Sequence, residues 1–122
     1  MDLNQKIIDA LNRVVAGKED YVYDENFCRY VKNGHPSCLW GHVLVDLGIP
    51  AAHLETAYHS TAIQIVLHEE FAGTPDLVDI ERAAAASQRA QDGRLETSGD
   101  RVERKTWGRA RDIYIETIAR LN

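Results

Sequence analysis

The sequence has few of the features that define secreted, membrane or disulfide-rich proteins. It has only two cysteines, which allow at most one disulfide, and no apolar run approaches the roughly 20 residues of a membrane-spanning helix. The start of the chain lacks the basic segment and apolar stretch of a secretory signal. We therefore expect a cytoplasmic protein without a membrane segment, whose cysteines are reduced or bound to metal.

Excess positive charge and phosphate-binding loops are also missing. The net charge is −5, which argues against a dedicated DNA-binding domain, because phosphate contacts need clustered Lys and Arg. Neither G-x-x-x-x-G-K-[ST] nor G-x-G-x-x-G occurs, so a nucleotide-binding fold is disfavoured. The hydrophobic fraction of 44% and the charged fraction of 27% are those of an ordinary globular protein, and 122 residues suit a single domain over 1–122.

Apolar periodicity predicts a mainly α fold, with five or six short helices in a compact bundle. In the first helix, over 2–16, Leu3, Ile7 and Leu11 share one face, with Asp2 as N-cap and Gly17 as the stop. Further helices are expected over 38–47 after a Ser37 cap, from Pro50, from 60 or 61 to 71, over 75–91 after a Thr74 cap, and from Trp107 to the end.

The segment over residues 20–32 has a different character. Tyr21–Tyr23 and Phe27–Val31 are β-branched and aromatic, and a turn-prone Asp24–Asn26 separates them. This pattern predicts one small β-hairpin near residues 20–32, followed by Lys32-Asn33-Gly34. A two-stranded hairpin needs helices to pack against, so we expect it to lie on the bundle.

The densest group of metal-binding residue types has the spacing C-x6-H-x2-C-x3-H. Its members are Cys28, His35, Cys38 and His42. Zinc accepts mixed thiolate and imidazole ligands, and Cys38 and His42 lie one helical turn apart, so a zinc site joining hairpin to helix is one interpretation. The spacing is not a standard zinc-finger pattern. The other interpretations are two buried cysteines, which we favour, a disulfide between them, and a nucleophilic Cys38.

A second candidate site is the basic segment over residues 101–111, whose charge of +4 leaves −9 on the rest of the chain. Basic side chains around an aromatic ring suit an acidic protein surface or a nucleic acid. The alternative that we favour is a Trp107 in the core with arginines on the solvated outer face. The candidate partner-binding residues are Arg101, Arg104, Lys105, Trp107, Arg109 and Arg111.

Several short motifs resemble a class of small uncharacterised proteins from actinobacterial phages and their hosts. These are Tyr21-Val22-Tyr23, Cys28-Arg29-Tyr30-Val31, Gly34, Pro36-Ser37-Cys38, Gly41-His42, Leu47-Gly48, Ala90-Gln91-Asp92-Gly93 and Thr106-Trp107-Gly108. The resemblance implies a small accessory protein of a phage or prophage, in the cytoplasm of the bacterial host. It implies no established activity and therefore no catalytic residue.

These observations favour a non-enzymatic accessory binding protein that engages and modulates a host protein. The chain's small size, its acidic charge with one basic segment, and the lack of a complete catalytic set support this hypothesis. One alternative is a small zinc- or cysteine-dependent enzyme centred on Cys28, Cys38 and His42. The other is nucleic-acid binding through residues 101–111, which the acidic charge disfavours.

Overall fold

The computed structural model describes residues 2–24, 29–59, 61–93 and 103–121. Within them the chain forms helices and one antiparallel hairpin, which confirms the predicted mainly α fold. The elements are α1 (Leu3–Val15), β1 (Val31–Lys32), β2 (His35–Pro36), α2 (Leu39–Asp46), α3 (Ala51–Ala57), α4 (Ile63–Glu70), α5 (Leu77–Asp92) and α6 (Trp107–Leu121).

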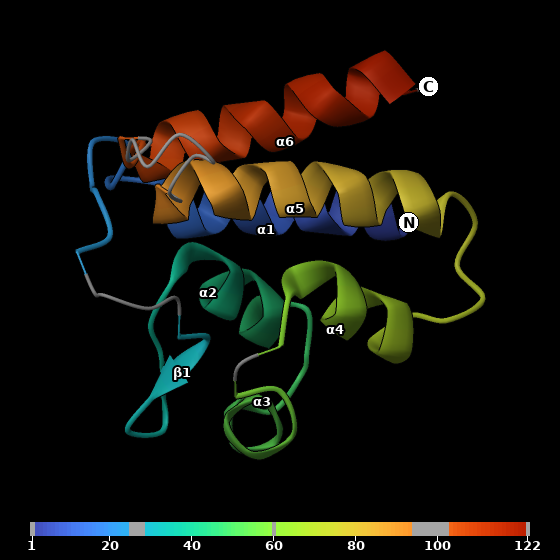
Figure 1. The fold of residues 1–122 in the computed structure, drawn as a ribbon, viewed down its shortest axis with the longest axis horizontal. Coiled ribbons are helices and arrows are strands. Elements are labelled where there is room, and N and C mark those ends of the chain that lie inside the picture. Colours follow the sequence, from blue (N-terminus) through green and yellow to red (C-terminus); the bar gives the residue numbers. More distant parts are fainter. Residues whose placement is uncertain (1, 25–28, 60, 94–102, 122) are drawn as a thin grey trace, which may run out of the picture.

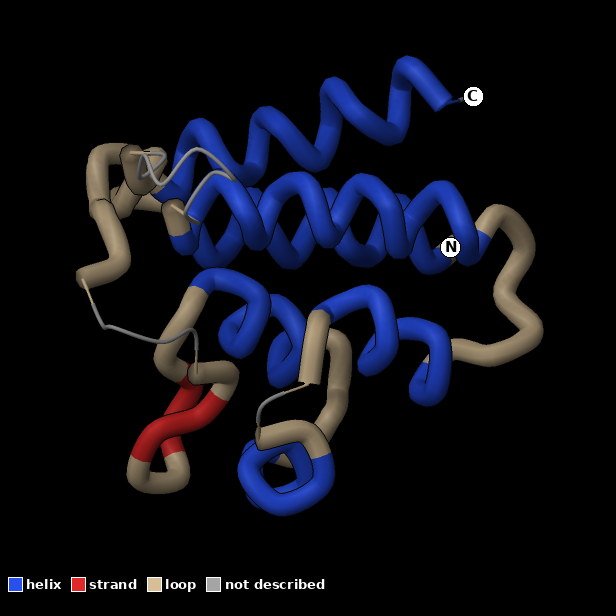
Figure 2. Tube along the Cα trace, in the orientation of Figure 1, coloured by secondary structure: helices blue, strands red, loops and turns tan. Residues whose placement is uncertain are grey.

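The three long helices lie together on one side of the molecule. Figure 1 shows α1, α5 and α6 with nearly aligned axes, and α6 runs antiparallel to α5. The shorter α2 packs against α1 and α5, and the shorter α4 packs against α5, while α3 and the hairpin lie beyond them on the opposite side of the molecule (Figure 2). No helix in the described part of the chain has both the length and the apolar character needed to cross a membrane.

Helix α1 has the boundaries that its sequence predicts. The Asp2 carboxylate accepts a hydrogen bond from the backbone N–H of Gln5 at 2.8 Å, which caps the first turn. Leu3, Ile7 and Leu11 are buried on one face. Gly17 follows the helix with a φ of 76°, a left-handed conformation that glycine adopts without strain.

The hairpin lies further along the chain than predicted. β1 pairs with β2 in antiparallel register, Val31 opposite Pro36 and Lys32 opposite His35. Asn33 and Gly34 form the turn, with φ values of 54° and 81°, and two positive φ angles are typical of the tight type I′ hairpin turn. The prediction of a strand at Tyr21–Tyr23 is wrong, because the backbone of that segment contacts the start of α6.

Two predicted helix caps are also wrong. Cys38 and not Ser37 is the N-cap of α2, and the Ser37 hydroxyl lies 2.8 Å from the Tyr23 hydroxyl. A side chain of a distant helix, α5, supplies a hydrogen-bond acceptor for the first turn of α2 instead. The backbone N–H of Leu39 donates to Gln91 Oε1 at 2.7 Å. Asp76, rather than the predicted Thr74, is the N-cap of α5.

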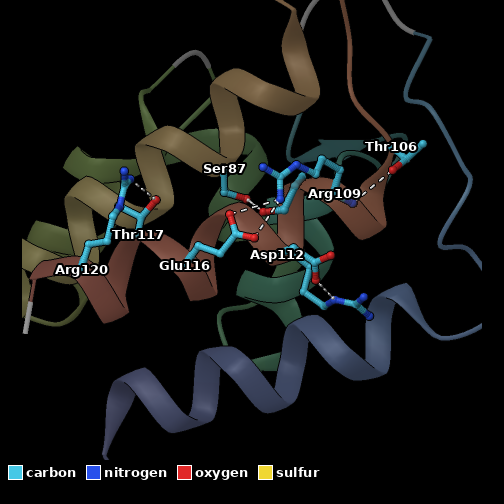
Figure 3. Close-up of polar contacts among 9 residues, drawn as sticks. Ser87, Thr106, Arg109, Asp112, Glu116, Thr117 and Arg120 are labelled. Atoms are coloured by element: carbon cyan, nitrogen blue, oxygen red, sulfur yellow. Dashed lines mark hydrogen bonds and ion pairs between the residues drawn. The ribbon is translucent and has the colours of Figure 1, made fainter.

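A buried hydrogen-bond chain joins three helices through the core. Trp40 Nε1–H on α2 donates to Ser87 Oγ on α5 at 3.0 Å, and the Ser87 hydroxyl donates to the backbone carbonyl of Ala110 on α6 at 2.8 Å. Figure 3 shows Ser87 reaching toward α6. Trp40 and Ser87 are both completely buried, so these two hydrogen bonds hold α2, α5 and α6 in their packed arrangement.

Candidate functional site

Three segments that are separated in the sequence line an open pocket at one end of the bundle. The start of α6, the segment after α1 and the start of α2 meet there (Figure 1). The pocket has a volume of about 530 Å³ and is lined by residues 17–21, Ser37, His42 and Trp107. This volume suits a small molecule or a few side chains of a partner protein. We call it the Trp107 pocket.

The backbone of the segment after α1 is held by the first turn of α6. The backbone N–H of Trp107 donates to the carbonyl of Tyr21 at 2.8 Å, and that of Gly108 donates to the carbonyl of Glu19 at 3.1 Å. A Cβ atom at Gly108 would lie 2.9 Å from the Glu19 carbonyl oxygen, so glycine permits this close approach. The contacts satisfy N–H groups that a helix start otherwise leaves unpaired, and they give the pocket wall a fixed main chain.

Trp107 forms the inner wall of the pocket and is only 2% exposed. The ring of Tyr21 lies edge-on to it, with centroids 4.7 Å apart, and the imidazole of His42 lies 5.5 Å away. The Lys18 ammonium lies 5.8 Å from the indole centroid. Among the described residues, the buried indole Nε1–H of Trp107 has no hydrogen-bond partner.

His42 lines the pocket from α2 and is half-buried. Burial lowers the pKa of this imidazole below its ordinary value of 6.5, and the positive charge of Lys18 lowers the pKa further. His42 is therefore a neutral ring at pH 7. A neutral imidazole both donates and accepts hydrogen bonds, so it can face either kind of group on a ligand.

Replacing Lys18 by glutamine should raise the pKa of His42, because one of the two causes of its lowering is removed. The pKa should stay below 6.5, since the burial of the ring remains. An NMR titration of the His42 ring protons in both proteins measures the change. Lys6→Gln, on the exposed side of α1, is the matched control and should leave the titration unaltered. An unchanged pKa in Lys18→Gln would place the ammonium away from the pocket.

The predicted metal ligands lie in different environments. Cys38 is completely buried at the start of α2, whereas His35 is exposed on β2 and His42 faces the Trp107 pocket. Cys28 lies outside the described residues. In the ranges that the structure describes, no three His, Cys, Asp or Glu side chains are grouped so that they could hold a metal ion. The zinc site stays a prediction, since Cys28 belongs to it.

The predicted partner-binding residues mostly make contacts within the chain. Arg104 donates to the Tyr23 carbonyl at 2.7 Å, and Arg109 pairs with Glu116 at 3.0 Å (Figure 3). Arg111 contacts Asp112 at 3.1 Å and Glu19 at 3.9 Å. Lys105 is exposed, and Arg101 lies outside the described residues.

The structure brings together one residue from each predicted set. Trp107 was a candidate partner contact and His42 a candidate metal ligand, and their rings now face the same pocket. Lys18, Tyr21 and Ser37 were not predicted as site residues. Gly17 signalled the end of α1, but nothing local indicated that the next residues would cover α6.

Comparisons with protein-family models, with curated proteins and with solved structures found no match to this chain. The resemblance to phage proteins therefore stays a prediction, and function is argued from the geometry of the Trp107 pocket.

Proposed function

We propose that the protein is a non-enzymatic binding module that engages a partner protein through the Trp107 pocket. The observation that carries this proposal is a pocket with walls formed by Tyr21, His42 and Trp107 on a main chain held by the start of α6. Binding energy in protein interfaces concentrates at such aromatic side chains, in pockets near the centre of the contact. Tyr21 is 42% exposed and is the aromatic residue best placed to meet a partner.

The chemistry around His42 favours binding over catalysis. A nucleophile becomes reactive when a base lies within hydrogen-bond distance of it. In the described structure the Ser37 hydroxyl pairs with the Tyr23 hydroxyl, and the Cys38 side chain is completely buried. Neither group offers a substrate an accessible nucleophile activated by His42.

The biological role follows from the resemblance to phage proteins and is part of the proposal. As a small accessory protein of a phage or prophage, the protein would occupy a surface of a host protein in the bacterial cytoplasm. The Trp107 pocket would hold a protruding segment of that partner, and the basic side chains around the start of α6 would contact acidic groups beside it. Lys105 and Arg109 are both exposed, and Arg109 is paired with Glu116.

Selection from a random peptide library tests the proposal without knowledge of the host. Peptides selected on the wild-type protein should bind Tyr21→Ala at least about tenfold more weakly, because the exposed aromatic wall is removed. Val78→Ala, which shortens an exposed apolar residue on α5, is the control and should bind them unchanged. Peptides that bind Tyr21→Ala as well as the wild type would contradict the proposal.

A further inference from the structure

We infer that the Trp107 pocket anchors an anionic hydrogen-bond acceptor, a carboxylate or a phosphate group on the partner's peptide. This inference rests on the proposed function and adds the chemical class of the group that enters the pocket. The indole N–H of Trp107 and the ammonium of Lys18 are the two donors that would hold it.

The two tryptophans of the chain differ in the state of their indole N–H groups. The N–H of Trp40 donates to Ser87 Oγ at 3.0 Å, as a buried donor should. The N–H of Trp107 is equally buried and has no acceptor in the described part of the chain. Because Trp107 lines the pocket, a ligand that enters there can supply the missing acceptor. The unpaired N–H therefore indicates an oxygen-bearing ligand.

A positive charge lies beside the two inner rings of the pocket. The Lys18 ammonium lies 5.8 Å from the Trp107 centroid, and the same charge lowers the pKa of His42. Two acidic residues, Glu19 and Asp20, also line the pocket. The Glu19 carboxylate lies 3.9 Å from the Arg111 guanidinium, and Asp20 is exposed, as Lys18 is, so water screens both of those charges. The Lys18 ammonium favours an anion over a neutral acceptor because it lies over the Trp107 ring itself.

The side chains that contact the Trp107 ring from residues 17–21 can move aside for a ligand. Lys18 is exposed and Tyr21 is 42% exposed, and exposed side chains change rotamer within nanoseconds. The main chain beneath them stays in place, because the Tyr21 and Glu19 carbonyls accept hydrogen bonds from the first turn of α6. Moving Lys18 and Tyr21 off the Trp107 ring therefore needs only side-chain motion.

The test follows the two indole N–H signals by ¹H–¹⁵N NMR during titration with three probes. The first probe is the peptide Gly-Glu-Gly, acetylated at its N-terminus and amidated at its C-terminus, the second is its Gly-Gln-Gly counterpart, and the third is inorganic phosphate. We expect the glutamate peptide or phosphate to shift the Trp107 signal in a saturable way. The Trp40 signal is the internal control and should not move, because its N–H is already bonded to Ser87.

Lys18→Gln tests the charge without disturbing the core. It should weaken the binding of the anionic probe about tenfold, while Lys6→Gln should leave it unchanged. The His42 ring signals should also respond to the anionic probe, because His42 lines the same pocket. Trp107→Phe removes the indole N–H and should abolish this response. Should that variant fail to fold, Lys18→Gln and the two indole signals of the wild type still decide the question.

Several results would overturn the inference. These are an equal shift with the glutamine peptide, equal shifts of both indoles, no shift with any probe, or an unchanged affinity in Lys18→Gln. A response to the glutamate peptide alone would identify the partner's group as an acidic side chain. A response to phosphate alone would identify it as a phosphorylated side chain. If the probes fail while library peptides still require Tyr21, the proposed binding function stands and only the anionic anchor is lost.

Discussion

Gly41→Ala should lower the free energy of unfolding by about 3 kcal/mol, the upper end of what overpacking a core costs. A Cβ atom at Gly41 would lie 2.0 Å from the backbone oxygen of Tyr30 and 2.6 Å from its carbonyl carbon. Tyr30 cannot easily retreat, because its carbonyl accepts from the backbone N–H of Ser37 at 2.9 Å and its hydroxyl donates to the Thr61 carbonyl at 2.6 Å. Helix α2 would have to shift within the core.

The direction in which Gly41→Ala changes the free energy of unfolding distinguishes a steric clash with Tyr30 from the effect of helix propensity. In an unobstructed helix, replacing glycine by alanine stabilises the protein by about 1 kcal/mol. Ala119→Gly, at an exposed position of α6, exchanges the same residue types in reverse and should cost about 1 kcal/mol. Chemical denaturation of the three proteins measures both changes. A Gly41→Ala variant more stable than the wild type would show that α2 does not lie against the Tyr30 backbone.

Ser87→Ala should lower the free energy of unfolding by about 2 kcal/mol, because it leaves a buried donor without an acceptor. The Trp40 indole N–H donates to Ser87 Oγ in the completely buried centre of the core. The substitution also removes the hydrogen bond from Ser87 to the Ala110 carbonyl. The loss should appear in urea denaturation as a lower midpoint with an unchanged slope.

A double-mutant cycle with Trp40→Phe isolates the shared hydrogen bond. The phenylalanine side chain has no N–H. Ser87→Ala should therefore lower the free energy of unfolding by about 1 kcal/mol less in the Trp40→Phe protein than in the wild type. Thr56→Ala is the control for loss of a hydroxyl, because Thr56 is exposed and its Oγ1 donates to carbonyls of its own helix. It should change stability by less than about 0.5 kcal/mol. Equal costs of Ser87→Ala in both backgrounds would mean that the two side chains are not coupled.

The scaffold and the pocket should respond differently to substitution. Gly41 and Ser87 are buried and position α2 against its neighbours, so their loss should appear in stability measurements. Tyr21 and Lys18 are exposed on the pocket wall, so their loss should appear in binding measurements. A loss of peptide binding in Tyr21→Ala without a loss of stability would assign the effect to the site.

The hairpin shows where a local prediction from sequence fails. Tyr21–Tyr23 has strong strand propensity, yet strand propensity depends on a neighbouring strand and on burial. The segment meets the start of α6 instead, so its carbonyls accept hydrogen bonds from Trp107 and Arg104. The Asn33-Gly34 pair indicated the position of the hairpin better than the strand propensity of Tyr21–Tyr23 did. Two positive φ angles at adjacent residues are typical of a tight hairpin turn.

The sequence by itself determined the mainly helical fold, the extent of α1 and the burial of its apolar face. Those features follow from side-chain periodicity and from residues a few positions apart, such as the Asp2 cap and the turn at Gly17. Only the tertiary structure decided that Trp107 meets His42 and lies beneath Lys18 and Tyr21. The pocket depends on how α6 packs against the segment after α1, and that packing is set by long-range burial and hydrogen bonds that no local pattern encodes.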